Sequence, residues 1–142
     1  MNNVYCIELP GGLSQEDCLE KLFCVLKPDL PQDKLQDLTE AVYLREDTSS
    51  TYVGNGLAVP HGRVKGLGSA FIVFGVSKGG IDWPSEECKA NIVALIGIDK
   101  SEVSKYLSIL QKISKWKKQN SALFETCDFG AIKNSISSSI QI

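Results

Sequence analysis

The feature that most constrains the fold is the nearly continuous apolar run from Ala90 to Ile98. A strand that is apolar on both faces is typical of the centre of a sheet whose two faces are both covered. The run is too short to cross a bilayer. A second stretch, Ala70–Val76, is rich in β-branched and aromatic residues and predicts a neighbouring strand. The chain therefore needs helices to cover both faces of a sheet.

The N-terminal half contains two stretches with helical periodicity. Ser14 followed by Asp17 resembles a capping box, and apolar residues at helical spacing come after it. Lys27–Pro28 ends this helix, and Pro31 suits the first turn of the next one. The second helix is predicted to run up to Leu44–Arg45, where polar residues break the pattern.

The rest of the chain completes an alternation of strands and helices. Residues 51–53 predict a short extended piece, and Gly79–Gly80 predicts a turn with Ile81–Asp82–Trp83 as a hairpin partner. Helical spacing returns over residues 103–113 and 129–140. With no linker or repeat, we expect residues 1–142 to form a single α/β domain, a mixed β-sheet flanked by helices on both faces.

Composition excludes several classes of protein. The net charge of -2 argues against a domain that neutralises nucleic-acid phosphates. The N-terminus lacks a basic segment followed by an apolar run, and no stretch is long enough to insert directly into a membrane. The cysteines contain no C-x-x-C pair, so we expect reduced thiols, no metal and no other cofactor; they are Cys6, Cys18, Cys24, Cys88 and Cys127. We expect a cytoplasmic protein.

The only histidine of the chain, His61, has an unusual setting. A neutral imidazole is nucleophilic near neutral pH. Pro60 stiffens the chain that enters His61, and Gly62 allows a backbone N–H to approach a phosphate closely. Gly54 and Gly56 permit a tight loop whose N–H groups could converge on an anion.

Basic side chains lie near this histidine in the sequence. Arg45, Arg63 and Lys65 supply positive charge, and an Arg presents a forked set of donors that matches a phosphate. These residues favour an anion or phosphoryl site. A polar turn residue between ordinary glycine turns is the alternative that the residues leave open.

The segment from Leu44 to Arg63 contains Leu44–Arg45–Glu46–Asp47 and then Thr51–Tyr52–Val53–Gly54–Asn55–Gly56–Leu57–Ala58–Val59–Pro60–His61–Gly62–Arg63. An Arg followed at this interval by G-x-G-x-A-x-P-H closely resembles the signature of the fructose/mannitol-type enzyme IIA domain. This family belongs to the bacterial phosphoenolpyruvate-dependent sugar phosphotransferase system and includes the nitrogen-regulatory enzyme IIA proteins. The resemblance covers essentially the whole chain, in its length and in the order of its helices and strands.

The resemblance implies a mixed sheet flanked by helices and a role for each matching residue. His61 would accept a phosphoryl group from the small phosphocarrier HPr, or its nitrogen-branch counterpart, and pass it to a cysteine or histidine of an enzyme IIB. Arg45 would stabilise the phosphoryl group, with Gly62 and Arg63 beside it. Thr51 matches a hydroxyl position that supports the loop, and a plain strand role is equally compatible with it.

The sequence departs from the family at one position. Sugar-type members commonly carry a second histidine near the start of the helix that follows the strand matching residues 92–98. Val103 falls near that position here, and the chain has no other histidine. Ser101, Ser104 and Lys105 are the candidates for a partial replacement. The departure implies slower phosphoryl transfer.

These observations give three hypotheses of function. The first is a phosphoryl carrier that serves an enzyme IIB. The second is a nitrogen-type regulatory module whose phosphorylation state controls its binding to target proteins; the lack of attached IIB or membrane IIC segments and of a second histidine favours it. The third is a degenerate domain that keeps the fold and loop without the transfer.

Overall fold

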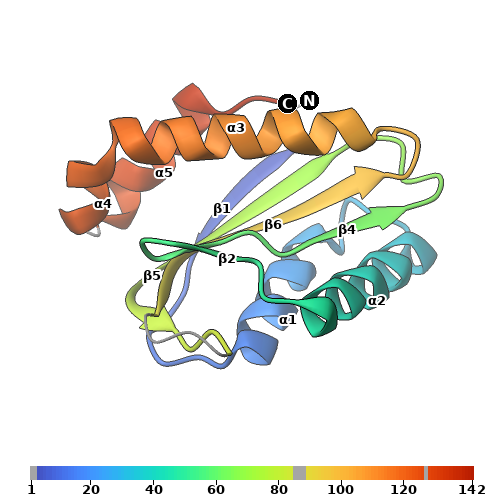
Figure 1. Cartoon of the computed structure of the whole chain (residues 1–142), viewed down its shortest axis with the longest axis horizontal. Coiled ribbons are helices and arrows are strands. Elements are labelled where there is room, and N and C mark those ends of the chain that lie inside the picture. Colours follow the sequence, from blue (N-terminus) through green and yellow to red (C-terminus); the bar gives the residue numbers. More distant parts are fainter. Residues whose placement is uncertain (1–2, 85–88, 127) are drawn as a thin grey trace.

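A mixed sheet forms the centre of the molecule (Figure 1). The computed structural model describes residues 3–84, 89–126 and 128–142. Within these ranges the strand order is β1-β5-β6-β3-β2, and β4 also pairs with β6. The strands are β1 (Val4–Glu8), β2 (Tyr52–Gly54), β3 (Leu57–Ala58), β4 (His61–Val64), β5 (Phe71–Ile81) and β6 (Ala90–Asp99).

Helices cover both faces of this sheet, as the sequence predicted (Figure 1). One face packs against α1 (Gln15–Leu26) and α2 (Gln32–Thr48). The other packs against α3 (Val103–Gln119) and α5 (Phe129–Ser139), with the short α4 (Ser121–Thr126) between them in the chain. The two apolar clusters are separated by the sheet, which is why the sequence shows apolar runs rather than alternation in its central strands.

β6 is the central strand that the apolar run predicted. Val93 and Leu95 belong to the cluster beneath α1 and α2, whereas Ile92 and Ile96 belong to the cluster beneath α3 and α5. β5 pairs with one edge of β6 in antiparallel register, while β3 and β4 pair with the other edge in parallel register.

β3 and β4 keep one register along β6. Ala58 pairs with Val93, and after Pro60 the pairing resumes with His61 opposite Ile96, so no residue is inserted or lost. Proline has no N–H to give to a ladder, but the carbonyl of Pro60 still accepts a hydrogen bond from the backbone of Ile96 at 2.9 Å. The register of β6 therefore sets the position of His61.

Helix α1 begins where the sequence predicted. Ser14 caps it by accepting a hydrogen bond from the backbone N–H of Asp17 at 3.1 Å, and the helix ends at Leu26. Helix α2 starts directly after Pro31 but continues to Thr48, beyond the predicted end. The polar residues in this last turn remain helical, and the hydroxyl of Thr48 donates to the carbonyl of Leu44 at 3.1 Å.

The predicted hairpin at Gly79–Gly80 is wrong. β5 continues through these glycines, and Ile81 pairs with Ala90 of β6 after an irregularity in the register. Gly80 adopts a φ of 85°, which bends the strand without reversing it. None of the helices in the described part of the chain is long and apolar enough to span a membrane.

Gly62 lets α2 approach β4 closely. A methyl group at this position would lie 2.9 Å from the Cβ of Ala41 and 3.1 Å from the backbone nitrogen of Val42. We therefore expect Gly62→Ala to lower the free energy of unfolding by about 1–3 kcal/mol, because α2 or the strand has to move. Urea unfolding followed by circular dichroism measures this loss.

Gly130→Ala is the matched control for this substitution. Gly130 lies in α5, and its added methyl would make only an ordinary contact, 3.6 Å from a carboxylate oxygen of Asp128. Alanine is the better helix former, so this variant should be more stable by about 0.5–1 kcal/mol. Equal effects of the two substitutions would contradict a steric role for Gly62.

Candidate functional site

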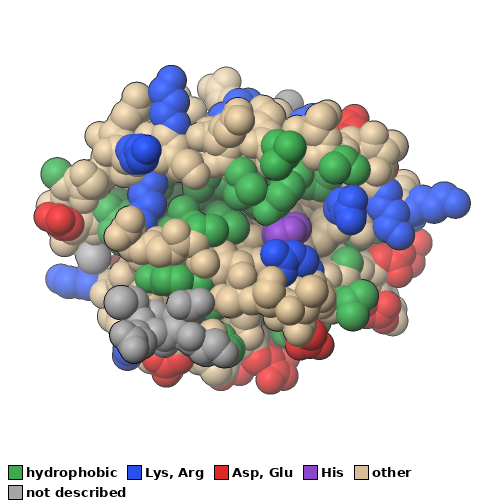
Figure 2. All heavy atoms as spheres, viewed as in Figure 1, with side chains coloured by type: hydrophobic (Ala, Val, Ile, Leu, Met, Phe, Trp, Pro, Cys, Tyr) green, Lys and Arg blue, Asp and Glu red, His purple; other side chains and the backbone are tan. Residues whose placement is uncertain are grey.

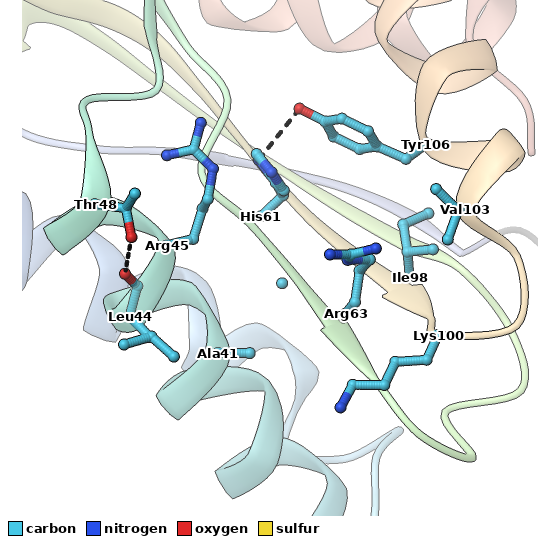
Figure 3. Close-up of a pocket in the computed structure, with 11 residues that line it drawn as sticks. Ala41, Leu44, Arg45, Thr48, His61, Arg63, Ile98, Lys100, Val103 and Tyr106 are labelled. Atoms are coloured by element: carbon cyan, nitrogen blue, oxygen red, sulfur yellow. Dashed lines mark hydrogen bonds between the residues drawn. The ribbon is translucent and has the colours of Figure 1, made fainter.

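A cavity of about 560 Å³ lies between α2, β4 and the first turn of α3 (Figure 3). It brings together residues that are far apart in the chain. It is lined by Ala41, Leu44, Arg45 and Thr48 of α2, by His61, Gly62 and Arg63, and by Ile98, Lys100, Val103 and Tyr106.

His61 is the first residue of β4 and is half-buried at this cavity. Its Nδ1 lies 3.0 Å from the backbone carbonyl of Val59. A carbonyl oxygen can only accept a hydrogen bond, so Nδ1 carries the proton of the neutral imidazole. Nε2 then keeps its lone pair and is the nucleophilic atom of the ring.

Tyr106 is a neighbour of His61 that the sequence reasoning missed. Its hydroxyl oxygen lies 3.3 Å from Nδ1 of His61, and the two ring centroids are 4.3 Å apart with planes inclined by 33° (Figure 3). The helical spacing could have indicated this position. Residues three apart share a helix face, so Tyr106 lies on the same face of α3 as Val103, which also lines the cavity. The pattern identified Tyr106 only as a core position of the helix.

Cationic side chains reach the cavity from three segments of the chain. Arg45 comes from α2, Arg63 from β4, and Lys100 follows β6. Among the residues that the structure describes, no Asp or Glu lines the cavity. One nitrogen of the Arg45 guanidinium donates to the backbone carbonyl of Ser49 at 2.8 Å. Figure 2 shows the histidine at the surface beside basic and apolar side chains. The cavity therefore suits an anion.

The surroundings keep the imidazole neutral. Burial lowers the pKa of His61 below its ordinary value of 6.5, and the charges of Arg45 and Arg63 lower it further, against the opposing effect of the Val59 carbonyl. Burial raises the pKa of the Tyr106 phenol, with Arg45 opposing. At neutral pH the site holds an uncharged imidazole beside an uncharged phenol.

Thr51 lies outside the cavity. Its side chain is buried, and its hydroxyl donates to the carboxylate of Glu46, which also accepts from the amide of Gln15 at 3.1 Å. The backbone carbonyl of Thr51 accepts a hydrogen bond from the N–H of Val59 at 3.0 Å. Thr51 therefore supports the segment that leads to His61 and does not touch a group held in the cavity.

Gly54 and Gly56 do not form the anion-binding loop that the sequence suggested. With Asn55 they adopt positive φ angles at the turn between β2 and β3, and they do not line the cavity. The side-chain nitrogen of Lys117 donates to the carbonyls of Gly54 and Asn55. Gly54 and Gly56 are therefore ordinary turn residues, which was the alternative to an anion-binding loop.

The candidates for replacing a second histidine also lie elsewhere. The backbone N–H and the hydroxyl of Ser101 both donate hydrogen bonds to the carboxylate of Asp99. The Nζ atom of Lys105 forms an ion pair with a carboxylate oxygen of Glu102 at 3.7 Å. Neither these residues nor Ser104 and Lys65 line the cavity. Val103, at the expected place, does line it, and Tyr106 makes the contact with His61.

Two curated relatives place this chain among known proteins. It is 40% identical over 60 residues to a nitrogen regulatory protein from Pseudomonas putida, a match that covers 42% of this chain and 66% of that protein. It is 30% identical over 101 residues to the PTS system fructose-specific EIIABC component of Bacillus subtilis, covering 70% of this chain but only 16% of that protein.

Solved structures share the fold. IIA mannitol from Escherichia coli aligns with a TM-score of 0.68 at 21% identity, covering 88% of this chain and 86% of that one. A complex of enzyme IIA mannitol with phosphorylated enzyme IIB mannitol, from the same organism, aligns with a TM-score of 0.62 at 19% identity and covers 84% and 81%.

The model of one family matches residues 3–138, which is nearly the whole chain. That family is described as phosphoenolpyruvate-dependent sugar phosphotransferase system, EIIA 2. Its match agrees with the mixed sheet and with the helices on both faces. The chain belongs to the EIIA 2 family of the phosphoenolpyruvate-dependent sugar phosphotransferase system.

Proposed function

We propose that Nε2 of His61 accepts a phosphoryl group from an HPr-like phosphocarrier, or its nitrogen-branch counterpart, and passes it to an enzyme IIB. The observation that carries this proposal is the hydrogen bond between Nδ1 of His61 and the Val59 carbonyl, which leaves Nε2 as the nucleophile. Membership of the EIIA 2 family supports it.

The cavity supplies what phosphoryl transfer needs most, which is positioning and stabilisation of negative charge. Arg45 is the clamp, because its guanidinium is already held by Ser49 before a phosphoryl group arrives. Arg63 and Lys100 add positive charge from the other side of the cavity. Gly62 lets α2 pack closely against β4, which brings Arg45 to the cavity beside His61.

Exposed apolar side chains around the cavity support a protein as the partner. Leu44 is 70% exposed, Val103 47% and Leu107 59%, although each is a large hydrophobic residue. Leu44 and Val103 line the cavity from opposite sides, and Leu107 lies one turn farther along α3. Exposed apolar residues gathered at a site are typical of a protein-binding surface. The solved complex of IIA mannitol with a phosphorylated IIB supports an enzyme IIB as that partner.

A regulatory module is the second candidate function. In place of a second imidazole the cavity holds Val103 and the neutral phenol of Tyr106, so one potential cation near the phosphoryl group is missing. Transfer is then slower than in a member with two histidines, and a switch tolerates slow turnover. The 40% identity to a nitrogen regulatory protein supports this alternative, in which phosphorylation controls binding to a target protein.

The thiols fit a cytoplasmic location, which is part of this proposal. Cys6, Cys18 and Cys24 are free in the structure, as expected in a reducing compartment. Cys88 and Cys127 lie outside the described residues. Residues 1–142 act as one functional unit in this proposal.

The central test is phosphorylation of His61. Incubation with phosphoenolpyruvate, enzyme I and HPr should add one phosphoryl group that is labile in acid and stable in base, and intact mass spectrometry measures it. His61→Ala should remain unlabelled, because the chain has no other histidine. An unlabelled wild type, or equal labelling of both proteins, would refute the carrier function.

Onward transfer separates the two candidate functions. Mixing the phosphorylated protein with candidate IIB domains should move the label to IIB if the chain is a carrier. Retention of the label, together with binding to a target protein that depends on the phosphate, identifies the regulatory module.

Arg45→Gln should slow phosphorylation of His61 roughly a hundred-fold, because a preorganised donor at a developing anion is lost. Arg45→Lys keeps the positive charge but lacks the forked pair of donors, so its phosphorylation rate should lie between those of Arg45→Gln and the wild type. Lys21→Gln, an exposed change on α1, serves as the control. Labelling rates from quenched time courses measure the effects, and a wild-type rate for Arg45→Gln would exclude Arg45 as the clamp.

The lowered pKa of His61 predicts the pH dependence of its reactivity. The neutral imidazole is the nucleophile, so acylation by diethyl pyrocarbonate should remain fast below pH 6.5 and fall only at lower pH. The chain unfolded in urea should lose reactivity near the ordinary value. Because there is one histidine, absorbance reports this residue alone. If the reactivity of the folded protein had its midpoint above pH 6.5, burial and the two arginines would not lower the pKa of His61.

A further inference from the structure

Tyr106 makes two contacts with the imidazole of His61. Its ring lies against the imidazole at a centroid distance of 4.3 Å with the planes tilted by 33°, and its hydroxyl oxygen lies 3.3 Å from Nδ1. The side chain extends from α3 towards His61, on the side of the cavity opposite α2 (Figure 3). The ring contact limits rotation of the imidazole, and the hydroxyl contact involves the nitrogen that does not react.

The direction of the hydrogen bond follows from the partner that Nδ1 already has. Because the Val59 carbonyl accepts from Nδ1, that nitrogen presents an N–H to Tyr106. The phenol oxygen can therefore only accept there, and the N–H is shared between two oxygen acceptors, as in a three-centre hydrogen bond. The hydroxyl hydrogen of Tyr106 points elsewhere and stays available as a donor in the cavity that the residue lines.

We propose that Tyr106 is a positioning residue for phosphoryl exchange. It holds His61 in the Nδ1–H tautomer with Nε2 facing the cavity, and its oxygen stabilises the positive ring formed when Nε2 is phosphorylated. This inference rests on the proposed function of His61. The phenol of Tyr106 differs in its task from a second imidazole. It acts on the ring of His61 and brings no positive charge to the cavity.

The exchange step shows why a second acceptor at Nδ1 matters. The lone pair of Nε2 forms a bond to phosphorus while the bond from phosphorus to the donor's leaving atom breaks, and that electron pair stays with the donor. Nδ1 keeps its proton, so the ring carries a positive charge next to the phosphoryl group. Hydrogen bonds from a charged group are stronger than those between neutral groups, so both acceptors favour this state.

The reverse step uses the same contacts. A ring that retains its Nδ1 proton leaves phosphorus as a neutral imidazole, whereas a ring that has lost this proton would leave as an anion. Retention of the proton therefore keeps the phosphoryl group transferable. Tyr106 and Val59 together set how readily His61 gives up the group.

Tyr106→Phe tests the hydroxyl, because it keeps the ring and removes only the oxygen. The single histidine allows ¹⁵N-histidine labelling, so NMR reports the two ring nitrogens of His61 without ambiguity. The wild type should show a protonated Nδ1 and an unprotonated Nε2 at neutral pH. In the variant the proton affinity of the ring should fall roughly three- to ten-fold, as expected for the loss of one hydrogen bond. Phosphorylated Tyr106→Phe should also pass its label to an acceptor more slowly by a similar factor.

Tyr43→Phe is the matched control, since Tyr43 lies on α2 and its ring packs near Phe23, away from His61. It should leave the ¹⁵N signals and the titration of His61 unchanged. A Tyr106→Phe protein with wild-type tautomer, titration and transfer would overturn the inference. A wild type that protonates Nε2 rather than Nδ1 would overturn it without any variant.

The NMR measurement also separates this inference from the proposed function. The tautomer and the titration are read in the unphosphorylated protein, so Tyr106 can be tested even if His61 takes no label from HPr. Failure of labelling alone refutes the carrier function. Unchanged ¹⁵N signals in Tyr106→Phe, with normal labelling of the wild type, refute only the role of Tyr106.

Discussion

β6 is paired along both of its edges and covered on both of its faces, and the other parts of the molecule take their places from it. β4 follows its register, which puts His61 opposite Ile96. The chain leaves β6 at Asp99 and enters α3 at Val103, so the first turn of that helix returns beside β4. Gly62 admits α2 from the other side. The cavity is thus the place where three elements meet around one buried strand.

The cavity attracts an anion and keeps its nucleophile by the same means. Burial suppresses protonation of the imidazole, and the positive charges that draw phosphate act in the same direction. Both effects keep Nε2 unprotonated, which is the form that can attack phosphorus. A lysine at position 61 would be protonated at neutral pH unless its pKa fell by several units, so the imidazole is the side chain that satisfies both demands at small cost.

The strongly patterned parts of the fold could be predicted from the sequence. The run at Ala90–Ile98 and the capping box at Ser14 each specify their element locally, and both predictions are confirmed. β4 could not be found in this way, because His61–Gly62–Arg63–Val64 has little intrinsic preference for a strand and is extended through its pairing with β6. β1 is held similarly, by parallel pairing with β5.

The site was predictable only in part for the same reason. The cavity brings together four predicted residues, His61, Arg45, Gly62 and Arg63, because the local sequence contains all of them. Tyr106 is 45 residues away from His61, and only the packing of α3 reveals their contact. Thr51 and the glycines at 54 and 56 carry signals that turns and buried strands use equally well, so their positions depended on the tertiary structure.

The hydrogen bond from His61 to the Val59 carbonyl has a consequence for how such chains diverge. The imidazole satisfies a backbone acceptor at the point where Pro60 interrupts the strand, so it contributes to architecture as well as to chemistry. A descendant that had abandoned phosphoryl exchange would still be under selection to keep a donor there. Persistence of the histidine alone among diverged copies is therefore weak proof that the chemistry persists.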